Sequence, residues 1–365
     1  MKKIIYISSS TFPSTKANSV QVMKMCEQFG FTNELHLYGI RNNSTNESNI
    51  DLHEYYGCDK NFKISLVNHN SNLIYSSIIF FKLLFNTSDI YYSRNFLIAC
   101  LLKIICKKNV VFEVHVDPQF GPFYNKIFKP ILKYTNLKVV AISSKLKQIF
   151  VDYYHFKPDN VLVAHDAADP KKINSSFQEL NPENINVGYI GSLYEGRGLE
   201  IVCQLAKLND SIKFNIIGGS ENEINSLKIK YSYANLIFHG HVPYNEVPDY
   251  IKQQNILLAP YQKNLKVAGG VINTMEYMSP LKIFEYMASK RPMIISNLEI
   301  IHEVLDSKTA MFADPENIID WNKALNELIN NKILYREISS ASYSLFIEKY
   351  TVEERVNSII DFIKK

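Results

Sequence analysis

Short apolar runs alternate with longer segments of helical periodicity from the start of the chain. Residues 4–8 predict a strand, and residues 19–29 predict a helix because Val20, Met23 and Phe29 fall on one side of it. Further strands are predicted by the apolar runs at 35–38, 89–92, 110–116, 138–142 and 160–164. Alternation of this kind is typical of a parallel sheet with helices on both faces.

The same alternation resumes after a polar stretch at residues 171–183, which we interpret as a linker. A helix is predicted at residues 199–208, and an amphipathic segment at residues 351–363 closes the pattern. Strands are predicted at 186–190, 213–217, 236–239, 256–259 and 293–296. The chain therefore carries two successive sets of strands and helices.

The two sets predict an α/β protein with two Rossmann-like αβα domains that face a central cleft. We place the first domain at residues 1–170 and the second at residues 171–350, and we expect the final helix, residues 351–365, to pack back on the first domain. Ligands of open parallel sheets bind outside the carboxyl ends of the strands. The cleft is therefore the expected binding site.

The composition is that of a globular protein, with 46% hydrophobic and 21% charged residues in a chain of 365. This length suits two domains that each bury a core. The five cysteines are widely spaced and form no C-x-x-C pair, so neither a disulfide framework nor a zinc site is expected. No run of about 18 apolar residues occurs, so we expect no membrane span and a cytoplasmic protein.

Positive charge is concentrated in one part of the chain. Residues 81–138 hold nine basic and three acidic side chains, whereas the net charge of the whole chain is only +4. A basic surface there favours an anionic bilayer or a phosphate-bearing substrate, and a lysine-rich solvated surface explains the same count. Residues 123–134 interleave aromatic and basic side chains, which predicts peripheral contact with an anionic inner membrane.

Residues 279–285 carry the pattern of a helix start that binds phosphate. Ser279 suits the N-cap and Pro280 the first helical position, so free backbone N–H groups would follow near Leu281. Lys282 adds a full positive charge in the first turn, and Glu285 lies on the same helical face, where a carboxylate can accept bonds from ribose hydroxyls. An exposed ion pair after an ordinary cap is the competing interpretation.

Two further loops follow predicted strands. Residues 187–198 form a strand, a glycine-rich turn and a helix start, in which Gly191 permits close approach to an anion and Arg197 can grip a diphosphate. Such turns also occur as purely structural loops. Residues 8–19 follow the first strand, and Asn18 or Ser19 is expected to cap the next helix and face the cleft, with a plain connecting loop as the alternative.

Together these motifs resemble the retaining glycosyltransferases of family 4, which have the two-domain GT-B fold. The resemblance covers essentially the whole length and is strongest over residues 186–300. It implies that the turn from Gly191 to Gly198 binds the donor diphosphate, with Arg197 at the position of the family's lysine. Ser192 stands where the family has an arginine, so Lys282 is expected to carry more of the phosphate charge.

The resemblance assigns further residues to the donor. Glu285 matches the second of two family glutamates and is implied to bind the ribose, whereas Tyr277 stands at the first, near the transferred sugar or the acceptor. Gly240, His241 and Val242 lie in a loop similar to the one that reads the donor base. The full implied nucleotide set is Gly191, Ser192, Arg197, Gly240, His241, Val242, Ser279, Pro280, Leu281, Lys282 and Glu285.

His115 resembles the histidine that the family places near the donor sugar at the end of a first-domain strand. The implied catalytic residues are therefore His115, Arg197 and Lys282, while Asn18 and Ser19 border the diphosphate and the acceptor. A lone histidine at a strand end is otherwise more often structural.

The implied reaction moves a hexosyl-type sugar from a UDP- or GDP-sugar to a lipid-linked or surface-glycan acceptor, as in lipopolysaccharide or capsule synthesis. It is expected to retain the anomeric configuration by a metal-independent front-side displacement, without a cofactor and without nucleic acid as partner. Two alternatives remain open: a non-catalytic sugar-nucleotide-binding subunit, and a sugar-nucleotide 2-epimerase of the same fold.

Overall fold

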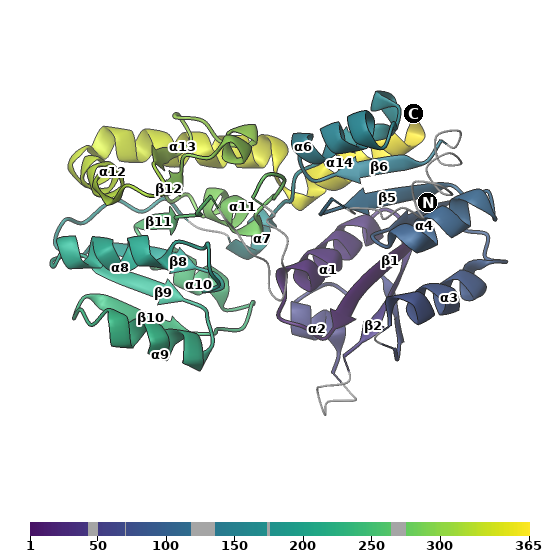
Figure 1. Cartoon of the computed structure of the whole chain (residues 1–365), viewed down its shortest axis with the longest axis horizontal. Helices are drawn as coiled ribbons and strands as arrows, with labels where there is room; N and C mark the ends of the chain where they lie inside the picture. Colours follow the sequence, from purple (N-terminus) through teal and green to yellow (C-terminus); the bar gives the residue numbers. More distant parts are fainter. Residues whose placement is uncertain (43–49, 70, 118–135, 174–175, 264–274) are drawn as a thin grey trace. The chain divides into compact units, whose positions relative to one another are not determined.

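The computed structural model describes residues 1–42, 50–69, 71–117, 136–173, 176–263 and 275–365. The chain divides into two compact units (Figure 1). Unit 1 comprises Met1–His165 and Val352–Lys365, and unit 2 comprises Asp166–Thr351. The divisions therefore lie at 165/166 and 351/352, where the sequence predicts 170/171 and 350/351.

Unit 1 is built on a parallel sheet of seven described strands, in the order β3-β2-β1-β4-β5-β6-β7. The strands are β1 (Lys3–Phe12), β2 (Glu34–Arg41), β3 (Lys63–Val67), β4 (Ile90–Ser93), β5 (Val110–Val114), β6 (Lys138–Ala141) and β7 (Val161–Val163). Their carboxyl ends share one edge of the sheet, and His115 follows β5 directly at that edge.

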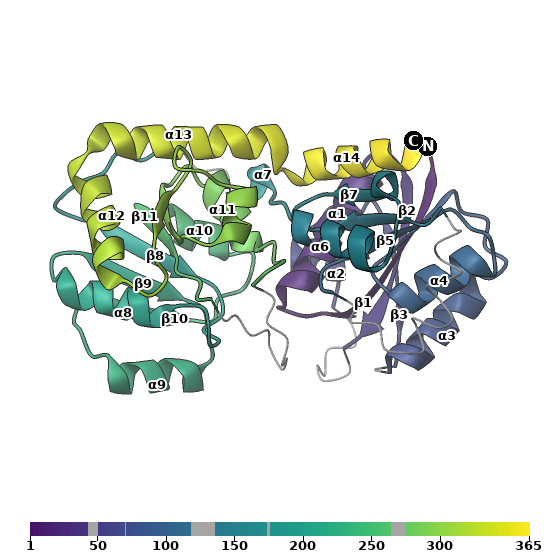
Figure 2. The ribbon, with the colours of Figure 1, turned by 45° about the horizontal axis from the view of Figure 1, so that its top comes forward.

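The described helices of unit 1 cover this sheet. They are α1 (Ala17–Gly30), α2 (Leu52–Tyr56), α3 (Asn72–Leu83), α4 (Phe96–Ile104), α6 (Ser144–Gln148), η2 (Ile149–Tyr153), η3 (Pro158–Asn160) and α14 (Val352–Lys364). Helix α14 packs on α1, so the final helix belongs to unit 1. Helices α3 and α4 lie side by side, as Figures 1 and 2 both show.

Unit 2 is built on a parallel sheet of six described strands, in the order β10-β9-β8-β11-β12-β13. The strands are β8 (Asn186–Ile190), β9 (Lys213–Ile217), β10 (Leu236–Gly240), β11 (Ile256–Ala259), β12 (Met293–Ser296) and β13 (Met311–Ala313). Its helices are α7 (Pro170–Ile173), α8 (Leu199–Leu208), α9 (Glu221–Lys230), α10 (Val247–Lys252), α11 (Leu281–Ala288), η4 (Glu299–Glu303), α12 (Ile318–Asn330) and α13 (Lys332–Lys349).

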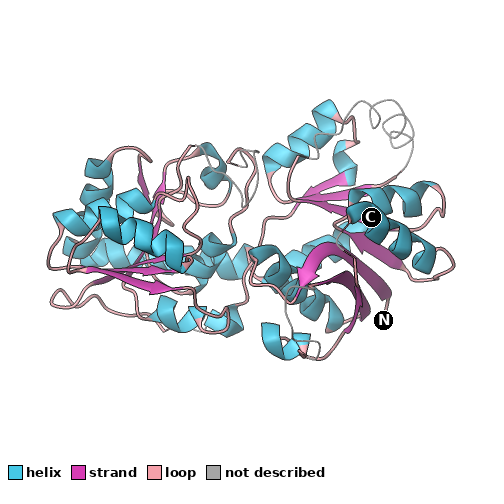
Figure 3. Cartoon of the chain, turned by 60° about the horizontal axis from the view of Figure 1, so that its bottom comes forward, coloured by secondary structure: helices cyan, strands magenta, loops and turns pink. Residues whose placement is uncertain are grey.

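Apolar cores lie on both faces of the second sheet, between the layers of helices that Figure 3 shows. Successive side chains of a strand point to opposite faces of the sheet, so neighbouring residues pack into different cores. Leu257 packs with Phe284 of α11, whereas its neighbour Leu258 packs with Trp321 of α12. This packing fixes α11 against the sheet and so positions the side chains of its first turn.

The sequence predicts neither β3 nor β13, each of which lies at one edge of its sheet. β3 is only partly buried over most of its length and includes Lys63 and Ser65, so its apolar signal is weak. β13 has only three residues. The interpretation of residues 171–183 as a linker is also wrong in part, because helix α7 occupies Pro170–Ile173.

Candidate functional site

A glycine-rich turn joins β8 to α8 in unit 2. Gly191, directly after β8, has φ +146°, and a Cβ atom added to it would lie 2.9 Å from Nζ of Lys282. Gly198 has φ +70°, and a Cβ atom there would lie 1.7 Å from the carbonyl oxygen of Pro260. Glycine at these two positions lets the turn fold tightly and leaves room for the Lys282 side chain.

Lys282 and Arg197 bring two cationic groups together beside this turn. Lys282 Nζ lies 3.9 Å from the ring centroid of Tyr189 and 5.3 Å from that of Tyr261. Cζ of Arg197 lies 5.7 Å from the same Tyr261 ring. Within the described part of the chain, neither Lys282 Nζ nor Arg197 Nε has a hydrogen-bond partner, although both atoms are buried. Two aromatic rings thus hold a pair of cations that carries no paired anion among these residues.

The surroundings of Lys282 disfavour its charge. Burial, and next the charge of Arg197, lower the pKa of the Lys282 ammonium well below its usual range, while Glu285 acts in the opposite direction. Leaving a buried cation without a hydrogen-bonded counter-charge is costly. An anion bound between Lys282 and Arg197 would remove that cost, so the pair is suited to a phosphate group.

Glu285 lies one turn after Lys282 in α11. Its side chain is buried, with the residue 8% exposed, and its Oε1 accepts a 2.8 Å hydrogen bond from the hydroxyl of Tyr244. Burial raises the pKa of Glu285 to about 7, against the opposing effects of the Tyr244 bond and of Lys282. Glu285 is therefore not part of an exposed ion pair, which was the competing interpretation of this motif.

The start of α11 differs from the sequence prediction. The helix begins at Leu281, Pro280 is its N-cap residue, and no side chain of the described ranges caps it. The predicted N-cap, Ser279, is wrong because its Oγ instead accepts a 2.8 Å bond from the backbone N–H of Asp166. The first turn of α11 thus keeps backbone N–H groups without a side-chain acceptor, next to Lys282, and such groups attract anions.

The loop after β10 lies beside α11 and contacts Glu285. Gly240 accepts a 2.7 Å backbone bond from Gly218, which fixes the end of β10 against the end of β9. His241 is exposed and Val242 packs against the core that contains α11. Two residues later Tyr244 contacts Glu285. The predicted base-reading loop and the predicted ribose-binding carboxylate are therefore neighbours.

Two more predicted residues of unit 2 have structural roles of their own. The backbone oxygen of Ser192 accepts a 2.6 Å bond from the hydroxyl of Tyr189, which orients the ring under Lys282. Tyr277 is 6% exposed and so is part of the interior, while the adjacent Glu276 is exposed. Unit 2 thus brings together the turn, Arg197, Lys282, Glu285 and the loop after β10.

His115 belongs to a separate cluster in unit 1. Its Nε2 lies 2.5 Å from Oε1 of Glu113, two residues earlier on the same side of the strand. A carboxylate oxygen of Glu113 also lies 3.7 Å from Nε of Arg94, the other lies 3.4 Å from Nη1 of Arg355, and the Tyr92 hydroxyl donates a hydrogen bond to Oε2. Burial alone would raise the pKa of Glu113, but Arg355, His115 and Arg94 hold it well below its usual range.

Arg355 links this cluster to the final helix. It lies in α14 and donates to the carbonyl oxygens of His165 at 2.7 Å and of Ala164 at 3.3 Å. The sequence analysis missed Glu113, Arg94 and Arg355. An arginine within the apolar stripe of α14, beside Val356, was the one available signal.

Asn18 and Ser19 are not caps of α1, contrary to the prediction. The helix begins at Ala17 after Lys16, so both residues lie in its first turn. Their side chains return to β1 instead: Ser19 Oγ donates to the carbonyl of Thr11 at 3.1 Å, and Asn18 Nδ2 donates to Ser10 Oγ at 3.3 Å. These bonds hold the loop after β1, and Asn18 remains exposed.

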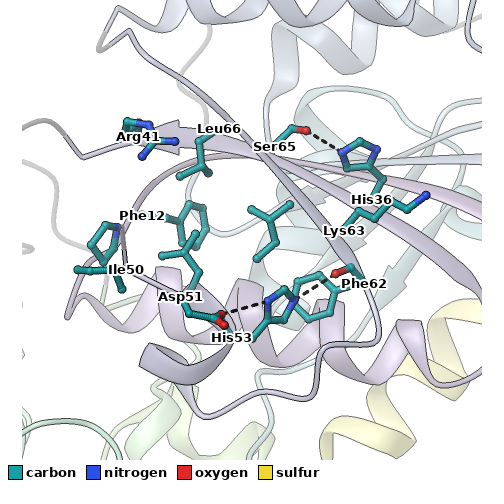
Figure 4. Close-up of a pocket in the computed structure, with 13 residues that line it drawn as sticks. Phe12, His36, Arg41, Ile50, Asp51, His53, Phe62, Lys63, Ser65 and Leu66 are labelled. Carbon is teal, nitrogen blue, oxygen red and sulfur yellow. Dashed lines mark hydrogen bonds and ion pairs between the residues drawn. The ribbon is translucent and has the colours of Figure 1, made fainter. Parts of the chain in front are cut away.

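Unit 1 also contains a hollow of about 560 Å³ beside α2, the outer strand β3 and its neighbour β2 (Figure 4). Phe12, Ile64 and Leu66 form part of its apolar wall, and Arg41 lies at its rim. None of the predicted site residues lines it.

In the part of the chain that the structure describes, no group of three or more His, Cys, Asp and Glu side chains is placed to hold a metal ion. Within the same ranges, no helix is both long and apolar enough to cross a bilayer. The aromatic and basic segment at residues 123–134 lies outside the described residues.

A known protein family matches residues of unit 2. Residues 171–345 match the family model described as glycosyl transferases group 1 and form a domain of that type. The chain is 25% identical over 193 residues to the poly(ribitol-phosphate) alpha-N-acetylglucosaminyltransferase of Staphylococcus aureus strain COL, covering 50% of this chain and 36% of that protein. It is also 25% identical over 198 residues to a 41.2 kDa protein from the cps region of Klebsiella pneumoniae, covering 53% and 49%. The chain thus matches less than half the length of each of these curated relatives.

Solved structures resemble the chain over its whole length. Anabaena HepE in complex with UDP has a TM-score of 0.74 at 11% identity and covers 99% of both chains. A mutant of S. aureus TarM in complex with UDP, alpha-GlcNAc-glycerol and fondaparinux has a TM-score of 0.73 at 12% identity and covers 100% of both. The predicted fold class is confirmed: two Rossmann-like domains of the GT-B type.

Proposed function

We propose that this chain, whose residues 171–345 form a group 1 glycosyltransferase domain, is a retaining glycosyltransferase of family 4. It would move a hexosyl-type sugar from a UDP- or GDP-sugar to a lipid-linked or surface-glycan acceptor. The observation that carries the proposal is the cation pair Arg197 and Lys282, whose Nε and Nζ atoms are buried without a hydrogen-bond partner among the described residues.

The donor diphosphate would bind between these cations and the start of α11. Nζ of Lys282 and Cζ of Arg197 lie 5.3 Å and 5.7 Å from the centre of the Tyr261 ring, and one phosphate is proposed to bridge them. Backbone N–H groups in the first turn of α11 would supply further donors. Gly191 keeps the turn free of a side chain at that point.

The nucleoside would extend from the diphosphate toward Glu285 and the loop after β10. Glu285 would accept hydrogen bonds from the two ribose hydroxyls, and the backbone of Gly240–Val242 would contact the base. The contact between Tyr244 and Glu285 supports this order, because it joins the two regions. HepE and the TarM mutant hold UDP in their structures, so UDP is the first nucleotide to test.

The proposed reaction is a front-side displacement in which the bond between the sugar and the donor phosphate breaks as the acceptor oxygen bonds to the same face of the anomeric carbon. The leaving phosphate oxygen takes the proton of the acceptor hydroxyl. Lys282, Arg197 and the helix N-terminus stabilise the charge that develops on that phosphate. All these groups come from the protein, so the proposal includes neither a metal ion nor a cofactor.

His115 is proposed to lie at the donor sugar, with Glu113 as its positioning residue. The carboxylate of Glu113 contacts Nε2 and so fixes the ring orientation. Asn18 and Ser19, in the first turn of α1, are proposed to border the acceptor. Tyr277 is proposed to take the position near the transferred sugar.

The acceptor is proposed to be a glycan of the bacterial surface. The S. aureus relative is named as acting on poly(ribitol-phosphate), and the Klebsiella relative is described as belonging to the cps region. A cytoplasmic protein in peripheral contact with the inner membrane would meet such an acceptor during its synthesis. Both statements are part of the proposal.

The test is turnover by a variant in which Arg197→Ala and Lys282→Ala are combined. We expect sugar transfer from the active nucleotide sugar to fall by at least about a thousandfold, as is typical when charge-stabilising groups are removed. A melting temperature near that of the wild type would exclude unfolding as the cause. Undiminished transfer by this variant would refute the proposed role of the two cations.

A thermal-shift screen of UDP, GDP, ADP and their sugars identifies the base, because a ligand of the native state raises the melting temperature. Binding without transfer to any acceptor or water would favour the non-catalytic subunit. Interconversion of a free sugar nucleotide would favour the epimerase. Transfer that persists in EDTA is expected from the proposed mechanism, and complete loss in EDTA would contradict its metal independence.

A further inference from the structure

Arg94 is a largely buried cation that uses few of its hydrogen-bond donors. It follows β4 directly, and its side chain is 9% exposed. Its Nε lies 3.7 Å from Oε1 of Glu113, and its Nη1 lies 3.5 Å from the backbone oxygen of Asn18. Among the residues that the structure describes, its Nη2 donates no hydrogen bond. A guanidinium has five N–H donors, so most of those of Arg94 are available to a ligand.

Glu113 is one carboxylate shared by two guanidinium groups. Nη1 of Arg355 lies 3.4 Å from its Oε2, and Arg94 faces its Oε1. The side chain of Arg355 is only 2% exposed and also donates to backbone carbonyl oxygens. Arg94 instead extends from the buried Glu113 to Asn18, which is exposed. The single negative charge of Glu113 thus offsets at most one arginine, and Arg94 is the one that lies nearer the surface.

Arg94 also lies beside His115. Both side chains contact the same oxygen of Glu113, since Nε2 of His115 lies 2.5 Å from Oε1. Strands β1, β4 and β5 are neighbours in the sheet, so the residues that follow them share one edge. Ligands of parallel sheets bind at this edge. An anion held by Arg94 would therefore lie next to His115 and to Asn18, which is proposed to border the acceptor.

We propose that Arg94 binds an oxyanion of the acceptor, which is either the phosphate of a phosphate-bearing glycan or the carboxylate of an acidic sugar. The planar guanidinium can donate two parallel hydrogen bonds to either group. A neutral acceptor would leave this largely desolvated charge without a counter-ion. The inference rests on the proposed glycosyl transfer and narrows its acceptor to anionic glycans. The competing role is structural, in which Arg94 only ties the first turn of α1 to Glu113.

Ligand-observed NMR titration of the full chain tests the proposal. The probes are glycerol 3-phosphate and glucuronate, with glycerol and glucose as their neutral counterparts. Saturating UDP is present throughout, so that the cations of unit 2 are already occupied. We expect at least one anion to bind about tenfold or more tightly than its counterpart, which is typical of hydrogen bonds to a charged group. Preference for glycerol 3-phosphate identifies a phosphate, and preference for glucuronate identifies a carboxylate. Equal binding of anionic and neutral probes would overturn the proposal.

Variants assign the preference to Arg94. Arg94→Gln can still donate to the backbone oxygen of Asn18 but should lose the preference for the anion. Arg94→Lys keeps the charge without the planar fork and should retain part of it, which also provides a folded variant if Arg94→Gln unfolds. The matched control is Arg41→Gln, which removes an exposed arginine at the end of β2. The control should bind like the wild type. Equal loss in Arg94→Gln and Arg41→Gln would indicate attraction by net charge alone and would overturn the proposal.

Kinetics and UDP binding separate the acceptor from the donor. For an anionic acceptor, Arg94→Gln should raise KM by at least about tenfold and lower kcat less, whereas a structural role would weaken transfer to anionic and neutral acceptors alike. Its affinity for UDP should be unchanged. A loss of UDP affinity would show that Arg94 binds the donor's own phosphate and would overturn its assignment to the acceptor.

Failure of the proposed function is distinguishable from failure of this inference. If the wild type neither binds UDP nor transfers sugar, the proposed function fails. The probe titrations are then made without UDP on Arg197→Ala/Lys282→Ala, which lacks the cations of unit 2. An anion preference that disappears on adding Arg94→Gln to this variant would still support an anion site at Arg94, and its absence would overturn the site.

Discussion

At the scale of single residues, the proposed donor-binding groups include a carboxyl group that burial makes costly to ionise. Burial raises the pKa of Glu285 to about 7, from the ordinary glutamate value that applies in the unfolded chain. Because the folded pKa is the higher one, ionisation of Glu285 withdraws stability as the pH rises from the unfolded value through about 7. At pH 8 the ionised carboxylate is therefore destabilising.

We predict that Glu285→Gln stabilises the protein at pH 8 by up to about 3 kcal/mol and has little effect at pH 5. The amide oxygen can still accept the Tyr244 bond, so packing is retained. Urea denaturation at the two pH values measures the difference. The same variant should bind UDP more weakly. Equal stability of the variant and the wild type at pH 8 would contradict the claim that burial raises the pKa of Glu285.

For the cluster around Glu113 we expect the opposite dependence of stability on pH. The pKa of Glu113 is held well below its usual range, so its contribution to stability is present above the unfolded glutamate value and is lost as the pH falls through the folded value. This contribution depends on Arg355, whose Nη1 lies 3.4 Å from the carboxylate. Removing either partner leaves the other as a buried unpaired charge.

We predict that Arg355→Met or Glu113→Gln destabilises the protein by about 3 kcal/mol, and that the double variant loses less than the sum. Denaturation of the four proteins gives the coupling energy. Arg355→Lys, which keeps the charge, should lose less than Arg355→Met. Strictly additive losses would show that the two side chains act independently. We also expect each single variant to reduce transfer, because Glu113 positions His115.

Sequence reasoning singled out Arg197, Lys282 and Glu285 as candidates because each lies within a motif of a few residues. It could not find Tyr244 at Glu285, or Arg355 at Glu113, because these contacts join positions 41 and 242 residues apart. Ser279 and Ser19 have residue types that suit caps. Their hydroxyl groups are instead used in bonds to Asp166 and Thr11, which depend on tertiary packing.

At the scale of elements, the predictions succeed where a strand or helix lies in the interior. The predicted bounds of β9, β11, β12 and α8 coincide with those of the structure. Central strands of parallel sheets are buried on both faces and so read as continuous apolar runs. β3 was missed because it alternates Lys63 and Ser65 with apolar residues, and β13 was missed because it has only three residues.

The turn between β8 and α8 gives a prediction at this scale. A methyl group at Gly191 would meet the flexible end of Lys282, whereas at Gly198 it would meet the backbone of Pro260. We expect Gly191→Ala to lower UDP affinity about tenfold while reducing stability by about 1–2 kcal/mol, the usual cost of a strained backbone position.

Gly198→Ala is the variant to compare with Gly191→Ala. Its added methyl group would clash with the backbone of Pro260, which cannot move without disturbing the sheet. It should reduce stability by more than Gly191→Ala does. Calorimetric titration with UDP and urea denaturation separate the two effects. Wild-type UDP affinity in Gly191→Ala would contradict the placement of the donor phosphate beside Lys282.

At the scale of the whole molecule, the chain forms unit 1 from two separated segments. Helix α14 follows unit 2 in sequence yet packs on α1, and its Arg355 bonds to the backbone at Ala164 and His165. Unit 1 therefore has an incomplete core until the last residues are present. The alternation of strands and helices predicted two domains, and the amphipathic stripe of the final helix predicted a buried face without indicating the domain on which it packs.

We predict that unit 1 is strongly destabilised in a chain that ends at Thr351. The deletion removes Val356 and Ile359 from its core and leaves Glu113 without Arg355. Limited proteolysis should cleave within residues 1–165 while residues 166–351 resist. A chain lacking only Lys365, which is exposed, is the control. Equal resistance of the truncated and full-length chains would contradict this role of α14.

The central claim is that the cation pair Arg197 and Lys282 binds the donor diphosphate, and calorimetric titration with UDP and with uridine tests it most directly. The account predicts that the wild type binds UDP far more tightly than uridine. It predicts that Arg197→Ala/Lys282→Ala, still folded, binds UDP no more tightly than uridine. Undiminished affinity of this variant for UDP would contradict the claim. If the wild type prefers guanine, the same titrations are made with GDP and guanosine, and undiminished affinity for GDP would contradict it.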